Sequence, residues 1–93
     1  MFDTNEYFEG KVKSIAFNTG QKSATVGVMA AGDYVFNTQQ KEKMSVISGK
    51  LSIQLQDSDE NTDYQAGESF EVAANSSFKV SVPHDTAYLC EYG

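Results

Sequence analysis

The chain has 93 residues, a length typical of one small domain, and we expect a single domain over residues 1–93. Thirteen acidic residues stand against seven lysines, there is no arginine, and the formal net charge is −6. Such a surface repels polyanions and lacks the guanidinium groups that favour guanine and phosphate contacts, so we expect no nucleic-acid partner.

Cys90 is the only cysteine, which excludes an intramolecular disulfide and fits a reducing compartment. The segment 1–10 has neither the basic start nor the apolar centre of a signal peptide. No apolar run approaches the roughly 18 residues of a membrane helix. We therefore expect a soluble cytoplasmic protein with no membrane partner. Because so short a chain buries a modest core, we also expect a homodimer.

Apolar and polar residues alternate along most of the chain, which predicts strands and no helix. In chain order the alternating segments are 12–17, 24–29, 34–38, 44–47, 51–56, 70–72, 78–82 and 88–92. Val12 is out of phase with Ile15 and Phe17, which predicts a bulge in the first segment. The acidic run 57–63 predicts an exposed loop. Many short strands separated by turns are typical of an all-β sandwich or barrel.

Two stretches resemble the sequence motifs of the cupin superfamily, which are small jelly-roll barrels. Glu42 and Gly49 have the spacing of the end of the first motif, and counting back places Phe36 and Thr38 at its two histidine positions. In the second motif, which begins at Gly67, the histidine position holds Phe78.

The resemblance therefore predicts a cupin-like jelly-roll barrel without the usual metal ligands. Three histidines and a glutamate hold the ion in metal cupins, and only Glu42 remains here. One carboxylate, the Thr38 hydroxyl and two phenyl rings do not make the coordination shell of a transition metal. We expect no metal site and no cofactor.

The match is tighter for one family within the cupins. The chain resembles the pyrimidine/purine nucleoside phosphorylase family from residue 5 to residue 92, in order and with compatible spacing. The strings that carry the resemblance are NEYFEGKVKS (5–14), VGVM (26–29), GDYVFNT (32–38), EKMSVISGKL (42–51), YQAGESFEV (64–72) and YLCEY (88–92). The family implies a homodimeric enzyme that uses inorganic phosphate to cleave purine and pyrimidine ribonucleosides to a free base and a pentose 1-phosphate.

Phosphorolysis of an N-glycosidic bond passes through an oxocarbenium-like transition state, so it benefits from an anionic group near the ribose. Glu42 is the candidate catalytic residue, because its carboxylate can accept hydrogen bonds from ribose hydroxyls. Thr38 offers a hydroxyl to the sugar or to phosphate. The phosphate needs a cation or backbone amides, and among Lys11, Lys13 and the lysines beside Glu42 we select Lys13, which lies in a family string.

The departing base needs a stacking surface and a hydrogen-bond donor. Tyr34, Phe36 and Phe78 can form an apolar slot that stacks on any base, which would account for broad specificity. Tyr88 or Tyr34 can supply the hydroxyl donor. A second reading is a non-catalytic cupin that binds a small ligand in the same slot. A cation opposite the aromatic slot would favour the enzyme.

Overall fold

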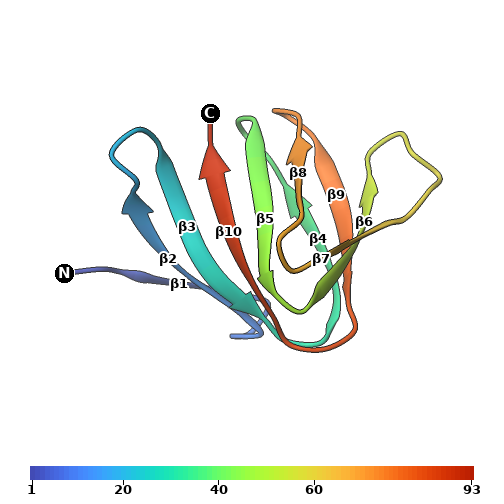
Figure 1. Cartoon of the computed structure of the whole chain (residues 1–93), viewed down its shortest axis with the longest axis horizontal. Coiled ribbons are helices and arrows are strands. Elements are labelled where there is room, and N and C mark those ends of the chain that lie inside the picture. Colours follow the sequence, from blue (N-terminus) through green and yellow to red (C-terminus); the bar gives the residue numbers. More distant parts are fainter.

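The computed structural model describes residues 1–93 as two antiparallel β-sheets without a helix (Figure 1). The strands are β1 (Thr4–Tyr7), β2 (Val12–Asn18), β3 (Ser23–Met29), β4 (Gly32–Asn37), β5 (Glu42–Ser48), β6 (Lys50–Leu55), β7 (Thr62–Gln65), β8 (Ser69–Val72), β9 (Ser77–Val82) and β10 (Thr86–Tyr92). The all-β prediction is confirmed. No helix is available to cross a membrane.

The larger sheet has the strand order β1-β2-β3-β10-β5-β8, and the smaller sheet has the order β4-β9-β6-β7. Some neighbouring strands are distant in sequence, such as β3 and β10. The chain between them passes repeatedly from one sheet to the other. In Figure 1 the two sheets lie opposite each other like the walls of an open barrel, with the β6–β7 loop projecting at the side. The C-terminus and the starts of β5 and β9 lie at the same end of this barrel.

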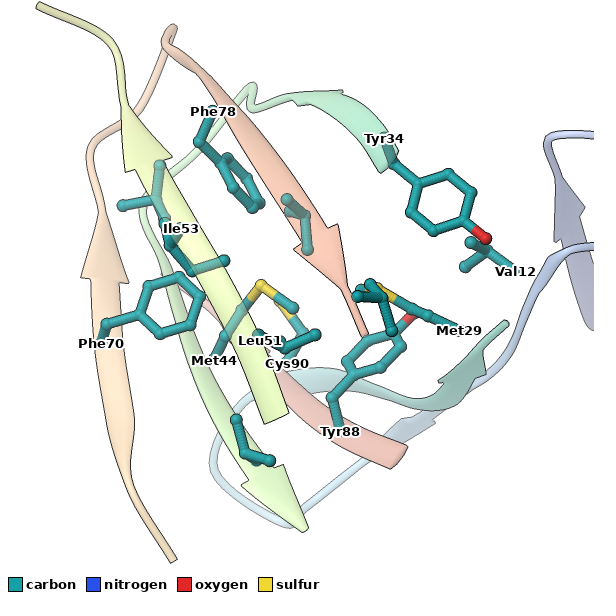
Figure 2. Packing of buried hydrophobic residues seen from close by; sticks show 14 residues of the cluster. Val12, Met29, Tyr34, Met44, Leu51, Ile53, Phe70, Phe78, Tyr88 and Cys90 are labelled. Atoms are coloured by element: carbon teal, nitrogen blue, oxygen red, sulfur yellow. The ribbon is translucent and has the colours of Figure 1, made fainter. Parts of the chain in front are cut away.

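The core fills the space between the sheets and draws on both of them. Successive side chains of a strand point to opposite faces, so each strand contributes alternate residues. Figure 2 shows side chains of strands β5, β6, β8 and β9 converging, namely Met44, Leu51, Ile53, Phe70 and Phe78. Leu51 is fully buried, and burying a side chain of this size stabilises the fold by about 1.5–3 kcal/mol.

The bulge predicted near Val12 is wrong. Strands β2 and β3 pair in unbroken register from Val12 to Asn18, with Val12 buried and Ile15 on the outer face. The phase break in the sequence arises because this sheet carries apolar residues on both of its faces. The observed irregularity lies elsewhere, between Ala87 and Tyr88, where β10 pairs with β5.

Gly49 closes the other end of the barrel. Its φ is 98°, a left-handed conformation that favours glycine, and a side chain there would collide with Thr86. The Thr86 hydroxyl accepts a hydrogen bond from the Lys50 amide at 3.1 Å and donates one to a backbone carbonyl, so it ties β10 to β6. A side chain at Gly49, the glycine that ends the first motif, would displace Thr86 and disturb this link between β10 and β6.

Candidate active site

A cavity of about 170 Å³ lies inside the barrel between the two sheets. It has room for one aromatic ring, since an apolar cavity of about 150 Å³ binds benzene. Its lining combines aromatic rings and thioethers with hydroxyl, thiol, amide and carboxylate groups. The lining residues are Tyr7, Ser14, Thr25, Met29, Phe36, Asn37, Glu42, Met44, Phe78, Tyr88, Cys90 and Tyr92.

Glu42 is the only charged side chain that lines this cavity. It begins β5, directly opposite Tyr92 at the end of β10. Its one hydrogen bond within the protein comes from the Cys90 thiol, with Sγ 3.4 Å from Oε1. Removal from water raises the pKa of Glu42, and the Cys90 hydrogen bond opposes that rise. A thiol is a weak donor, so the carboxylate retains most of its capacity to accept hydrogen bonds.

Three alternate residues of β10 face Glu42 and the cavity: Tyr88, Cys90 and Tyr92. Burial raises the pKa of Tyr88 and that of Cys90 to about 12, and it raises the pKa of Tyr92 as well. All three groups are therefore protonated at neutral pH. Tyr92 Oη lies 3.1 Å from Thr25 Oγ1, so a hydroxyl pair stands in the cavity wall.

Gly27 makes room for the Tyr88 hydroxyl. It is the cross-strand neighbour of both Ser14 and Tyr88. A Cβ atom at this position would lie 2.8 Å from Tyr88 Oη and 2.9 Å from the Cβ of Ser14. Only glycine allows the Tyr88 ring to extend across β3 toward Ser14.

Phe36 and Phe78 form the aromatic side of the cavity. They are cross-strand partners on β4 and β9, and their ring centroids lie 5.6 Å apart at an interplanar angle of 26°. Tyr34 lies on the same face of β4, with its centroid 6.2 Å from that of Phe36. The structure thus brings together the three residues that we expected to form an apolar slot.

The hydroxyls of Tyr34 and Thr38 are already bound within the fold. Tyr34 donates a hydrogen bond of 2.7 Å to the Ala30 carbonyl oxygen. Buried Thr38 donates one of 2.7 Å to the Ala73 carbonyl oxygen and accepts one from the Ser76 amide. Neither side chain lines the cavity.

Lys13 lies away from the other candidate residues. It alternates with the buried Val12 and Ser14, so its side chain points to the outer face of β2. There its ammonium group lies 3.3 Å from a carboxylate oxygen of Glu6, and both side chains are more than half exposed. No lysine lines the cavity, so the cation that would favour an enzyme is not found opposite the aromatic slot.

The donor atoms in the cavity do not suit the metal centre of the metal cupins. Phe36 and Phe78 occupy two of the three histidine positions, and no group of three His, Cys, Asp or Glu side chains gathers anywhere in the chain. Glu42 and a protonated Cys90 would be the only such ligands in the cavity. A transition metal needs more nitrogen, sulfur or carboxylate donors than this.

Several lining residues were not predicted from the sequence as part of the site, among them Tyr7, Ser14, Thr25, Cys90 and Tyr92. The alternation of β10 was a usable signal for two of them, because Cys90 and Tyr92 share the phase of Tyr88. Nothing in the sequence marked Ser14 or Thr25, whose small polar side chains face inward on strands with apolar outer faces.

Comparison with known proteins agrees with this architecture. A pyrimidine/purine nucleoside phosphorylase of Aeromonas salmonicida is 58% identical over 92 residues, covering 99% of this chain and 98% of the relative. Another from Hahella chejuensis is 55% identical over the full length of both chains. The crystal structure of a protein of unknown function from Vibrio parahaemolyticus, 45% identical, superposes with a TM-score of 0.96 over 100% of this chain and 99% of that one.

The fold extends to more distant proteins. An RmlC-like cupin from Shewanella frigidimarina, 16% identical, superposes with a TM-score of 0.77 over 99% of this chain and 83% of that one, which confirms the cupin-like barrel. The sequence profile that describes the pyrimidine/purine nucleoside phosphorylases matches residues 2–92. With this match over nearly the whole chain, and relatives above 50% identity at equal length, the chain belongs to the pyrimidine/purine nucleoside phosphorylase family.

Proposed function

We propose that this protein cleaves purine and pyrimidine ribonucleosides with inorganic phosphate, giving a free base and a pentose 1-phosphate. A phosphate oxygen forms a bond to the anomeric carbon as the bond from that carbon to the base nitrogen breaks. The bonding electrons leave with the base, which takes up the proton that the hydrogen phosphate loses as it becomes the sugar phosphate. The family of the chain supports this reaction class.

The observation that carries the proposal is the setting of Glu42. Its carboxylate is half-buried among aromatic and hydroxyl groups and receives only the weak Cys90 hydrogen bond. Such a group binds donors strongly, because little water competes for it. In our proposal it accepts hydrogen bonds from the ribose hydroxyls and stabilises the positive charge that develops on the sugar.

In this proposal the base binds between the aromatic rings of the barrel interior. Phe36 and Phe78 lie on one side of the cavity and the protonated Tyr88 lies on the other. Stacking reads the face of a base and not its hydrogen-bonding edge, which would allow purines and pyrimidines alike. A tyrosine hydroxyl then donates a hydrogen bond to the departing base.

We place the phosphate at the rim of the cavity, on the segment 38–41. This segment joins Asn37 to Glu42, and both of these residues line the cavity. The amides of Gln39 and Gln40 have no acceptor within the chain, and such free amides can bind an anion. Lys41 adds a positive charge there, although it is paired with Glu71 at 3.3 Å.

We further propose that the active form is a homodimer and that it works in the cytoplasm, where Cys90 would stay reduced. The outer face of the larger sheet carries an apolar patch of Ile15, Val26, Val28 and Leu89. Val26 is directly opposite both Ile15 and Leu89, and it is 38% exposed. A contiguous apolar surface on one sheet face is typical of a contact between subunits.

The reaction is tested by incubating a nucleoside mixture with the protein and separating the products by chromatography, with and without phosphate. We expect free bases only when phosphate is present. We also expect the same turnover after EDTA treatment, because Phe36, Thr38 and Phe78 replace the metal-binding histidines. Nucleoside binding without any base release would instead support the non-catalytic reading. Loss of turnover together with removal of bound metal would contradict a metal-free reaction.

A further inference from the structure

The turn between β1 and β2 has a backbone conformation that its residues do not favour. The Gly10 amide donates a hydrogen bond of 3.1 Å to the Tyr7 carbonyl, and the two residues between them have positive φ, 52° at Phe8 and 59° at Glu9. Tight turns of this kind prefer asparagine and glycine. An aromatic residue in the left-handed region is unusual and often reflects a functional constraint.

This conformation directs the Phe8 ring toward β4. Its centroid lies 4.9 Å from that of Tyr34 and 5.5 Å from that of Phe36, with an edge-to-face angle of 83° to Phe36. Strands β1 and β4 are edge strands of different sheets, so no backbone ladder joins them. Side chains close the barrel here, and Figure 2 shows the Tyr34 ring pointing across to Val12 of β2.

The contact reaches the cavity through Phe36. Phe36 lines the cavity and stacks on Phe78, whereas Phe8 packs edge-to-face with Phe36 and does not line the cavity. Tyr7, which immediately precedes the turn, lines the cavity from the other sheet. The turn between β1 and β2 thus places Tyr7 in the cavity lining and brings Phe8 against Phe36, which also lines the cavity.

Resting on the proposed function, we propose that Phe8 is a positioning residue for the base-binding slot. Its ring holds Phe36 against Phe78 and so fixes the width of the space in which a base stacks. Without that ring, Phe36 gains rotational freedom that nucleoside binding must remove. The effect falls on binding in the ground state and in the transition state alike, so it should raise KM and leave kcat nearly unchanged.

The test compares two glycine substitutions in the same turn. Both Phe8→Gly and Glu9→Gly place glycine at a left-handed position, but only Phe8→Gly removes the ring. We expect Phe8→Gly to raise the KM for uridine and adenosine about tenfold with kcat within about twofold. Glu9→Gly should keep wild-type kinetics, and Phe8→Tyr should restore them. Phe8→Leu also removes the ring but keeps apolar bulk, so it replaces Phe8→Gly in the test if that variant fails to fold.

Calorimetric titration with uridine in the absence of phosphate measures binding without turnover. We expect the Kd to rise about tenfold in Phe8→Gly and to stay unchanged in Glu9→Gly. An unchanged Kd in a folded Phe8→Gly protein overturns the role of Phe8, whatever the activity. Nucleoside binding that weakens as expected in a protein that never releases base leaves the role intact and overturns the proposed reaction. A wild-type protein that binds no nucleoside overturns both.

Discussion

The Cys90 thiol lies 3.4 Å from Oε1 of Glu42, and it is the only donor within the protein that this carboxylate has. The two residues come from neighbouring strands, β10 and β5, and both face the barrel cavity. A buried carboxylate is usually matched by stronger donors, such as arginine, backbone amides or several hydroxyls. Glu42 is thus poorly satisfied by the protein alone, which suits a group that binds a ligand.

The raised pKa of Glu42 predicts an acid limb in the pH profile of kcat/KM. The proposed reaction needs the ionised carboxylate, so activity should fall as pH decreases toward a pKa above the ordinary 4.5. In Glu42→Gln this limb should be absent from the residual activity. If Glu42→Gln keeps the acid limb unchanged, the limb arises from the titration of a group other than Glu42.

The same shift makes a prediction about stability. The pKa in the folded protein lies above that in the unfolded chain, so the stability contributed by Glu42 is present at low pH and is lost as pH rises through the folded-state pKa. Glu42→Gln should therefore gain stability relative to the wild type between acidic and neutral pH. Thermal melts of both proteins across this range measure the difference in Tm between Glu42→Gln and the wild type. A gain in Tm for the variant that is larger at acidic pH than at neutral pH would contradict the prediction.

Substitutions at Cys90 should move the acid limb in opposite directions. The Cys90 hydrogen bond lowers the Glu42 pKa, against the larger effect of burial. A serine hydroxyl is a stronger donor than a thiol, so Cys90→Ser should shift the limb to lower pH. Cys90→Ala removes the donor and should shift it to higher pH. Equal profiles for both variants would show that this contact does not tune Glu42.

The phosphate site can be located with two matched lysine substitutions. Lys41→Gln should raise the KM for phosphate about fivefold, the effect of losing one exposed charge contact, and leave the KM for uridine unchanged. Lys13→Gln should alter neither constant, because its ammonium group lies on the outer face beside Glu6. The opposite result would restore Lys13 as the phosphate ligand and move the site away from segment 38–41.

The resemblance to the cupin motifs placed Phe78 together with Phe36. The alternation of the sequence was sufficient to predict an all-β domain and to put Tyr34 and Phe36 on one face of a strand. It did not show which face of β2 and β3 turns inward. Both faces of these strands carry apolar residues, and the inner one includes polar Ser14 and Thr25 where a larger apolar side chain would be expected. The orientation of a strand of this kind depends on its neighbours in the sheet. Lys13 was selected without that knowledge.

The sequence also did not show which hydroxyl groups form hydrogen bonds within the fold. Tyr34 and Thr38 bond to the carbonyl oxygens of Ala30 and Ala73, and for Thr38 that acceptor is 35 positions away along the chain. Only the folded backbone decides whether such a hydroxyl is free for a ligand. Glu42 was easier to select as a candidate, because it is the one residue of the metal-binding set of the cupin motifs that this chain keeps, and the structure places it in the cavity lining.

The apolar patch of Ile15, Val26, Val28 and Leu89 predicts a homodimer that a single charged substitution within the patch dissociates into monomers. Val26→Lys should shift the mass in light scattering from twice the chain mass of 10.2 kDa to that of a single chain. Val35→Lys is the control, because Val35 is 53% exposed on the outer face of the other sheet. A wild-type mass equal to one chain would contradict the dimer, and a dimeric Val26→Lys would place its interface elsewhere.

The central claim is that ionised Glu42 stabilises the sugar during phosphate-dependent cleavage. Its most direct test is the steady-state rate of Glu42→Gln on uridine and 2′-deoxyuridine, beside the exposed control Glu60→Gln. We predict a loss of roughly 100- to 1000-fold in both kcat and kcat/KM for uridine, a smaller loss for 2′-deoxyuridine, and a Tm within about 5 °C of the wild type. Wild-type turnover of both nucleosides by Glu42→Gln would contradict the account.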